Sequence, residues 1–247
     1  MKILIRVSYL GTNYAGFQVQ KNAVTVQEKL QDAVESLYGI RYPLTGCSRT
    51  DSGVHARDFC CTIEAGADCE RIPFEKIPDA LNVRLPKDIS VFEASLMPDD
   101  FHPRYSVHFK EYEYLIYNSR KRSPFYEGRA FQYPTELDEI KMDRAADMFR
   151  GTHDFSAFMS SGSGVTDTVR TVKYCRATRN GREVRVTVAA DGFLYNMVRI
   201  IVGTLIEVSA GKIHEQDIPV IIESKERGRS GFTAPPEGLY LNKVVYR

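Results

Sequence analysis

Hydrophobic and polar residues alternate at the start of the chain, which places four large side chains on one side of an extended segment: Ile3, Ile5, Val7 and Tyr9. A period of two is typical of a β-strand with one buried face. Comparable patterns predict strands over residues 59–63, 89–94, 109–118 and 239–246. Two further strands flank Asn180-Gly181, a dipeptide that favours a tight hairpin turn. These strands predict a largely antiparallel sheet.

A second pattern, with apolar residues at every third or fourth position, predicts helices. It is clear at Val26, Leu30, Ala33 and Leu37. Thr25 and Glu28 form a capping box in front of this helix, and Gly39 suits its C-terminal cap. Further helices are expected over residues 74–81, 193–209 and 213–227, and over 135–150 with its start at Thr135. Strands and helices mix in both halves, so the predicted class is α+β.

An irregular segment, residues 97–103, contains two prolines and separates the two halves. We therefore predict an N-terminal domain over residues 1–100 and a C-terminal domain over residues 101–247. A chain of 247 residues is long enough for two small domains, each with a core of its own.

The composition favours a globular protein, since 43% of the residues are hydrophobic. No apolar run reaches the length of a membrane span, and the first residues open directly into a strand pattern. We expect a cytoplasmic protein without membrane association. The formal net charge of +1 argues against a strongly basic nucleic-acid binder. Arginines and lysines do cluster locally, at 120–122, at 176–185 and at 225–229, where they suit either phosphate contacts or a solvated surface.

The five cysteines do not suggest a metal site or a disulfide framework. They are Cys47, Cys60, Cys61, Cys69 and Cys175, an odd number with irregular spacing and without a Cys-x-x-Cys pair. Cys60 and Cys61 are adjacent, and neighbours in a strand point to opposite faces. We expect reduced thiols in the core and no bound metal.

One carboxylate stands among small residues in a segment that reads GCSRTDSGVHA from Gly46 to Ala56. Glycine next to a charged residue indicates a tight turn, because glycine adopts positive φ without strain. Small neighbours also let a substrate approach the backbone. Asp51 is therefore expected on a loop, where a substrate can reach it. His55 lies four residues further on, and we expect it to support the loop by hydrogen bonding.

This segment resembles the catalytic loop of the TruA family of tRNA pseudouridine synthases, which usually reads GRTDAGVH. Arg49-Thr50-Asp51 and Gly53-Val54-His55 match, whereas Ser48 and Ser52 replace glycine and alanine. Weaker resemblances extend along the whole chain. They imply the pseudouridine synthase fold, with two RRM-like (ferredoxin-like) halves, a largely antiparallel joined sheet and a central cleft.

The resemblance also implies the activity and the partners. Such an enzyme isomerises uridine to pseudouridine at positions 38, 39 and 40 in the anticodon stem-loop of tRNA, and it acts as a homodimer. The reaction moves the uracil from an N1 to a C5 bond without gain or loss of atoms or electrons. It therefore requires no redox cofactor and no metal, and we expect no cofactor. A carboxylate is an established covalent catalyst.

Site residues follow from the matching motifs. Asp51 is the implied catalytic nucleophile, although attack at C1′, attack at C6 and removal of a sugar proton all stay open. Arg199, in FLYNMVRIIVG from Phe193, is implied as its ion-pair partner. Tyr112, in KEYEYLIY from Lys110, is implied to stack on the target base and to assist proton transfer; Tyr114 shares its face. The expected substrate-binding residues are Arg49, Tyr112, Arg104 and Lys110.

Two rival functions compete with this hypothesis. A phosphotransferase that forms an aspartyl-phosphate usually has Asp-x-Asp after a strand together with Mg²⁺, but Asp51 is followed by Ser52-Gly53. A non-catalytic RNA-binding protein with RRM-like halves would explain the fold and the basic clusters. It would not explain a carboxylate in the central loop, where it would repel phosphates.

Overall fold

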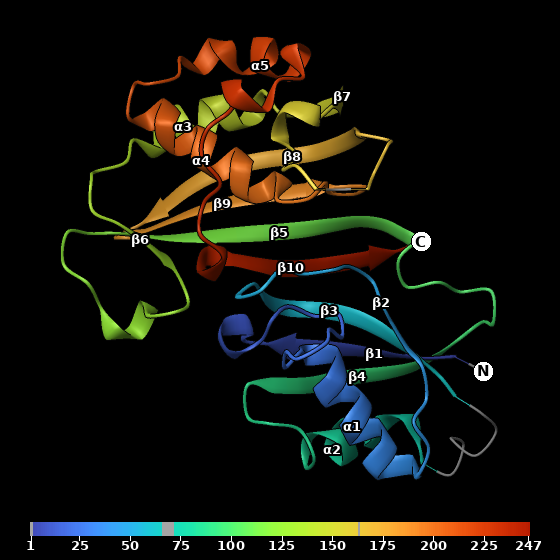
Figure 1. The fold of residues 1–247 in the computed structure, drawn as a ribbon. Coiled ribbons are helices and arrows are strands. Elements are labelled where there is room, and N and C mark those ends of the chain that lie inside the picture. Colours follow the sequence, from blue (N-terminus) through green and yellow to red (C-terminus); the bar gives the residue numbers. More distant parts are fainter. Residues whose placement is uncertain (1, 66–71, 163) are drawn as a thin grey trace. The chain divides into compact units, whose positions relative to one another are not determined.

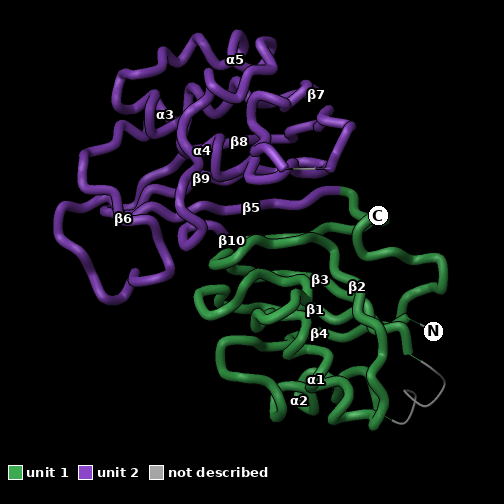
Figure 2. Tube along the Cα trace, in the orientation of Figure 1, with its two compact units in different colours: residues 1–108, 241–247 green, residues 109–240 purple. Residues whose placement is uncertain are grey.

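The computed structural model describes residues 2–65, 72–162 and 164–247. The chain divides into two compact units, shown in Figure 2. Unit 1 contains residues 1–108 and 241–247, and unit 2 contains residues 109–240.

Unit 1 is built on a mostly antiparallel sheet around β1 (Lys2–Tyr9). This strand lies between β3 (His55–Glu64) and β4 (Ile89–Met97), and it pairs antiparallel with both. The short strand β2 (Leu44–Gly46) and the final strand β10 (Leu239–Tyr246) are both neighbours of β3. As the alternating pattern predicted, the side chains of Ile3, Ile5, Val7 and Tyr9 are buried.

Two helices complete unit 1 (Figure 1). Helix α1 (Val26–Tyr38) begins as predicted, with the Thr25 hydroxyl accepting a hydrogen bond from the Glu28 amide, and Gly39 caps its end at a φ of 75°. Helix α2 (Ile77–Asn82) follows the 3₁₀ turn η3 (Phe74–Lys76) and packs against β4. The order β1-α1-β2-β3-α2-β4, with β1 between β3 and β4, is the βαββαβ arrangement of an RRM-like half.

Unit 2 also combines antiparallel strands with helices, but it contains additional elements and no visible sequence similarity to unit 1. Its main strands lie in the order β5 (Val107–Asn118), β9 (Glu183–Ala190), β8 (Val169–Asn180) and β7 (Gly151–Asp154), all antiparallel. The short strand β6 (Phe131–Tyr133) runs parallel to β5. Helix α3 (Glu139–Asp147) packs against β8, and helices α4 (Met197–Ser209) and α5 (Ile218–Ser224) follow β9.

The unit boundary differs from the predicted division into 1–100 and 101–247. It falls between His108 and Phe109, and the last strand returns to unit 1 from residue 241 onward. Side-chain contacts explain both differences. The Phe101 ring packs edge-on against Tyr246 with ring centroids 5.0 Å apart, and Lys2 Nζ donates a hydrogen bond of 2.8 Å to the Phe101 carbonyl. The irregular segment is therefore fastened to unit 1.

Helix α3 is shorter than the predicted 135–150 and is capped by Asp138, not Thr135. Asn118 binds the preceding residues outside the helix: its amide donates to the Thr135 carbonyl at 2.7 Å, and its oxygen accepts from the Leu137 amide at 3.1 Å. The predicted helix over 213–227 is likewise reduced to α5, because a 3₁₀ turn, η6 (Glu215–Asp217), precedes it and Lys225 ends it at a φ of 59°.

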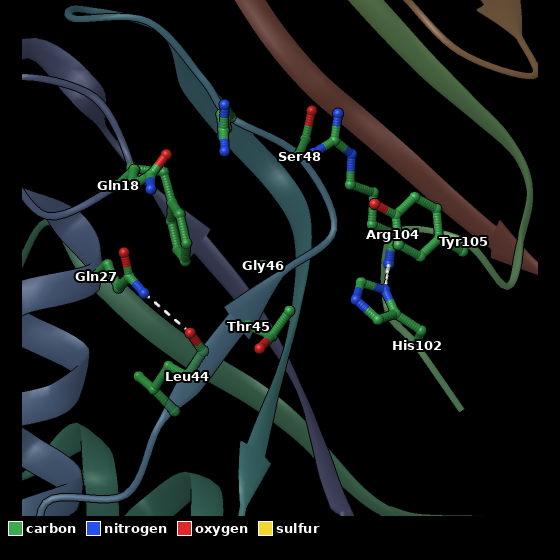
Figure 3. Close-up of a pocket in the computed structure, with 11 residues that line it drawn as sticks. Gln18, Gln27, Leu44, Thr45, Gly46, Ser48, His102, Arg104 and Tyr105 are labelled. Atoms are coloured by element: carbon green, nitrogen blue, oxygen red, sulfur yellow. Dashed lines mark hydrogen bonds between the residues drawn. The ribbon is translucent and has the colours of Figure 1, made fainter. Parts of the chain in front are cut away.

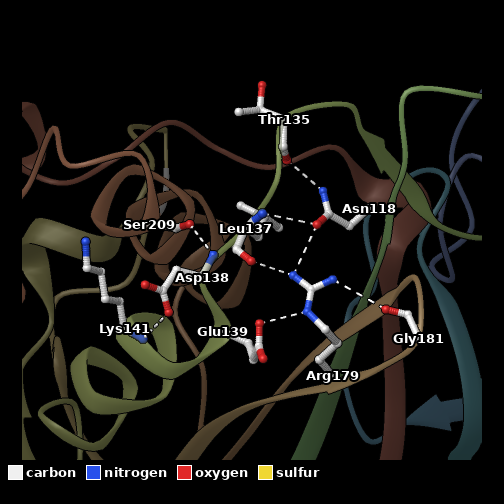
Figure 4. Close-up of polar contacts among 9 residues, drawn as sticks. All are labelled: Asn118, Thr135, Leu137, Asp138, Glu139, Lys141, Arg179, Gly181 and Ser209. Carbon is white, nitrogen blue, oxygen red and sulfur yellow. Dashed lines mark hydrogen bonds and ion pairs between the residues drawn. The ribbon is translucent and has the colours of Figure 1, made fainter.

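The hairpin arginines are engaged within unit 2. Arg179 donates to Glu139, to the Asn118 oxygen and to the Leu137 carbonyl (Figure 4). Arg176 pairs with Asp143, and Arg185 pairs with both Glu113 and Glu183. The structure therefore favours a stabilising role for these three side chains over phosphate binding. The turn itself uses Gly181 and Arg182, because Asn180 still pairs with Glu183.

The membrane expectation concerns the helices. Within the part of the chain that the structure describes, no helix combines the length and apolar character that crossing a membrane requires.

Glu139 offers a test of the Arg179 network. The hydrogen bond from Arg179 lowers the pKa of Glu139 in the folded protein, whereas an unfolded glutamate titrates near about 4.3. We expect Glu139→Gln to reduce the free energy of unfolding at pH 7 by about 0.5 to 1 kcal/mol. The difference from wild type should be full above the unfolded pKa and disappear as the pH falls through the folded one. Urea titrations across this range measure it.

The matched control is Glu136→Gln, which removes a carboxylate from an exposed residue of the same segment. Its effect on the free energy of unfolding at pH 7 should be smaller than that of Glu139→Gln. A Glu139→Gln difference that stays constant down to pH 2.5 would contradict the ion-pair interpretation.

Candidate active site

Asp51 lies on a tightly held loop between β2 and β3 in unit 1. Thr50 before it is buried; its hydroxyl is 2.8 Å from the Tyr9 hydroxyl, and its carbonyl accepts from the Phe17 amide at 3.2 Å. The Asp51 carbonyl accepts from the Val54 amide at 3.2 Å, and Gly53 has a φ of 78°. The predicted turn is confirmed, and it leaves Asp51 itself only partly buried.

A second backbone segment, residues 11–17, clamps this loop from the other side. The Tyr14 carbonyl accepts from the Ser52 hydroxyl at 3.2 Å and from the Gly53 amide at 3.4 Å. Two glycines permit the approach. A Cβ on Gly11 would lie 2.0 Å from the Val54 carbonyl oxygen, and one on Gly16 would lie 2.4 Å from the Thr50 oxygen. Any side chain at either position would therefore push the loop away.

His55 supports the loop, as predicted. It is fully buried at the start of β3, and its Nδ1 accepts a hydrogen bond of 2.9 Å from the Gly11 amide. An accepting Nδ1 requires the neutral tautomer with the proton on Nε2. The side chain thus joins the two segments.

The sequence did not single out the outer anchor of this clamp. The Tyr14 hydroxyl donates to Asp88 Oδ1 at 2.6 Å, and burial followed by this hydrogen bond raises the pKa of Tyr14 above its ordinary value. Asp88 lies just before β4. Tyr14 and Gly16 lie close together in the sequence, but the hydrogen-bond partner of Tyr14, Asp88, lies 74 positions away. Only the fold shows that they meet.

Two of the predicted substrate-binding residues, Arg49 and Arg104, line one pocket of unit 1 (Figure 3). Its volume is about 220 Å³, and Phe17, Gly46 and Ser48 also contribute to its wall. Both arginines are exposed. The structure therefore joins Arg104, which lies far along the chain, to the loop that carries Asp51.

Lys110 and Tyr112 belong to β5 in unit 2, where each side chain is almost completely buried, with 8% and 6% exposed. The Tyr112 ring packs edge-on against Phe193, with centroids 5.0 Å apart. Tyr114, the alternative on the same face, is fully buried and its hydroxyl donates to the Pro235 carbonyl at 2.7 Å. Burial raises the pKa of Tyr114 well above its usual range. Tyr114 is thus a core residue, and Tyr112, although also buried, stays the predicted stacking residue.

Arg199 lies in the first turn of α4 and is partly buried. Its Nε donates to the Ala234 carbonyl at 2.6 Å and its Nη1 to Asn196 Oδ1 at 2.8 Å. Asn196 caps this helix at a φ of 61° and also donates to the Ser160 hydroxyl. A guanidinium fixed by two acceptors is not a mobile surface charge.

The predicted residues therefore form two groups. Asp51, Arg49 and Arg104 belong to unit 1, and Lys110, Tyr112 and Arg199 belong to unit 2. In unit 1, Arg49 and Arg104 line one pocket. In unit 2, packing holds Tyr112 and hydrogen bonds hold Arg199. The pairing of Asp51 with Arg199, and the stacking of Tyr112 on a base, stay predictions.

The cysteines do not form a metal centre in the described residues, among which no cluster of three or more possible metal ligands occurs. Cys47, Cys60, Cys61 and Cys175 are buried and form no disulfide with one another, and burial raises the pKa of the last three above the ordinary value. Cys69 lies outside the described residues.

Comparisons with known proteins identify the class. The model of a family described as tRNA pseudouridine synthase matches residues 5–106 and 145–247, so the chain belongs to that family. It is therefore an isomerase that converts uridine to pseudouridine, and the resemblance of the Asp51 loop is confirmed at the level of the family.

Curated relatives narrow the assignment. A protein of Thermoanaerobacter sp. (strain X514) is 47% identical over 99% of both chains, and one of Acetivibrio thermocellus is 48% identical over 97% of both. Both are called tRNA pseudouridine synthase A. A solved structure titled "Crystal Structure of a Cbf5-Nop10-Gar1 Complex" is 12% identical with a TM-score of 0.39, covering 96% of this chain and 57% of that one. That likeness is too low to carry an argument.

Gly16→Ala tests the clamp. The added Cβ meets the Thr50 carbonyl oxygen, and the residue has a φ of 89°. We expect a loss of about 3 kcal/mol in the free energy of unfolding from strain and clash together. Pseudouridine formation should fall by at least about 100-fold where the protein is still folded, because a displacement near 1 Å costs that much. Urea denaturation and a turnover assay measure the two effects.

Gly39→Ala is the matched control, since Gly39 has a similar φ of 75° but nothing within 4 Å of an added Cβ. We expect it to cost only about 1 kcal/mol and to leave turnover unchanged. Equal effects of the two substitutions would show that close approach at Gly16 is unimportant.

Proposed function

We propose that the protein isomerises uridine to pseudouridine at positions 38, 39 and 40 in the anticodon stem-loop of tRNA, with Asp51 as the catalytic nucleophile. The observation that supports this most strongly is the clamped Asp51 loop, in a chain that is 47% identical over its full length to a tRNA pseudouridine synthase A. The proposal also includes a cytoplasmic location and a homodimer.

The chemistry is balanced without a co-reactant. The N1–C1′ bond breaks and a C5–C1′ bond forms, while C5 loses its hydrogen and N1 gains one. All three roles open to Asp51 require an ionised carboxylate, whether it attacks C1′ or C6 or removes a sugar proton. A partly buried carboxylate stays ionised best next to a fixed cation. Arg199 suits this role because two acceptors already hold its guanidinium in one orientation.

The remaining predicted residues would bind the RNA. Enzymes that act on a base must first take it out of the stack, and the exposed base gains from an aromatic surface. Tyr112 would supply that surface and take part in proton transfer. Arg49 and Arg104, which are exposed, would neutralise phosphates, while the buried Lys110 would support substrate binding from within β5. A non-catalytic RNA-binding protein would not need a carboxylate held on so rigid a loop.

Release of tritium from [5-³H]uridine in an anticodon stem-loop RNA tests the proposal. We expect release without added metal or nucleotide. Asp51→Asn keeps the size of the side chain but removes its charge, so it should abolish release, to less than about one part in 10³. RNA affinity should persist in a filter-binding assay.

Asp79→Asn, at an exposed carboxylate in the first turn of α2, is the control and should release tritium at the wild-type rate. Full activity of Asp51→Asn would refute Asp51 as the catalyst. Absence of release by the wild-type protein would refute the substrate assignment.

A further inference from the structure

We propose that the pocket beside the Asp51 loop is a subsite for a second nucleotide of the RNA, next to the target uridine in the strand. Tyr105 stacks on the base of this nucleotide, and Arg49 and Arg104 bind its phosphate. This inference rests on the proposed function, since it names a further part of the same substrate.

Tyr105 is the feature that requires an explanation. It is 76% exposed at the rim of the pocket, although most large aromatic side chains of unit 1 are buried. The His102 ring packs against it with centroids 4.3 Å apart, and the Arg104 guanidinium carbon lies 5.9 Å from its centroid. His102 also accepts a hydrogen bond from the Arg104 amide at 3.1 Å (Figure 3). The ring is thus supported by neighbours, while most of its surface stays open to solvent.

The charge of the pocket suits a phosphate. Its lining includes Arg49 and Arg104, and no carboxylate occurs among the described residues that line it. Neither guanidinium forms an ion pair within the described parts of the chain, in contrast to Arg176, Arg179 and Arg185 of the hairpin. Cations that are not neutralised internally are the ones that displace counterions from a nucleic acid. In Figure 3 the Arg104 side chain extends toward Ser48.

The pocket is small, and its walls suit a single nucleobase better than a larger ligand. A volume of about 220 Å³ is below the roughly 300 to 1,000 Å³ typical of sites for drug-sized ligands. Phe17 forms an apolar wall and is itself stacked on Phe59, with centroids 4.1 Å apart. Gly46 lets the Phe17 ring pack closely against β2, because a Cβ there would lie 2.6 Å from that ring. Gln18 adds an exposed amide that can donate to and accept from a base edge.

The position of the pocket determines which nucleotide it takes. Ser48 and Arg49 line the pocket and are followed directly by Thr50 and Asp51. Phe17 lines it as well, and its amide binds the Thr50 carbonyl within the clamp. A nucleotide in this pocket therefore contacts residues that precede Asp51 directly in the chain. Such closeness fits a neighbour of the target in the strand better than a distant part of the tRNA.

The test combines two variants with RNAs that each lack one base. In an Asp51→Asn background, which keeps the RNA unreacted, Tyr105→Ala should weaken binding of an anticodon stem-loop by about 5- to 150-fold, the range measured for loss of one stacked base. Tyr105→Phe keeps the ring and should bind within about 2-fold of the parent. Fluorescence anisotropy measures both.

Base removal identifies the occupant. At one position adjoining the target, an abasic RNA should lose affinity for the parent but none for Tyr105→Ala, because the two changes delete the same contact. Phe92→Ala, at a 49% exposed aromatic residue of β4, is the control and should bind every RNA like the parent.

Undiminished binding by Tyr105→Ala would overturn the subsite, and so would equal sensitivity of parent and variant at every abasic position. These failures are distinct from failure of the proposed function. In the latter case the wild-type protein would not release tritium from the RNA at all, whereas an active enzyme that is indifferent to Tyr105 defeats only the subsite.

Discussion

The close approach of residues 11–17 to the loop over residues 50–55 is the constraint on which the site depends. It brings two backbones nearer than any side chain at Gly11 or Gly16 would allow, and it is closed by hydrogen bonds at Thr50, Ser52, Gly53 and His55. Asp51 lies within the clamped stretch, so its position is set by the packing of unit 1. A substrate need not order this loop, which avoids an entropic cost during binding.

In unit 2, two residues of the proposed site are likewise held by their neighbours. Arg199 is held by the Ala234 carbonyl and by Asn196, and Tyr112, on β5, packs against Phe193. Each side chain is fixed before any substrate is present. Electrostatic stabilisation is most effective when charges are oriented in advance. Ion pairs also hold two hairpin arginines in place. Arg176 and Arg179, on β8, pair with carboxylates of α3 and so attach the strand to the helix.

The sequence predicted more of this molecule within each segment than between segments. Local signals identified β1, α1 with its caps, and the turn at Gly53, because alternation and capping act over a few residues. Thr135 was a wrong helix start because Asn118, on β5, forms hydrogen bonds with the backbone of Thr135 and Leu137 before the helix begins. The domain boundary and the Tyr14–Asp88 anchor likewise depend on partners far along the chain. Sequence motifs predicted the site residues. Only the fold shows that Arg104 lies in the same pocket as Arg49 of the Asp51 loop.

The central claim is that the clamp places the Asp51 carboxylate where the reaction needs it. Asp51→Glu tests this directly, because it keeps the charge and moves the carboxylate outward by one methylene. Under single-turnover conditions with saturating protein, we predict a fall of at least about 100-fold in the rate of pseudouridine formation, with RNA affinity unchanged. A rate within a few-fold of wild type would show that the exact position of the carboxylate is unimportant. That result would contradict the role proposed for the clamp.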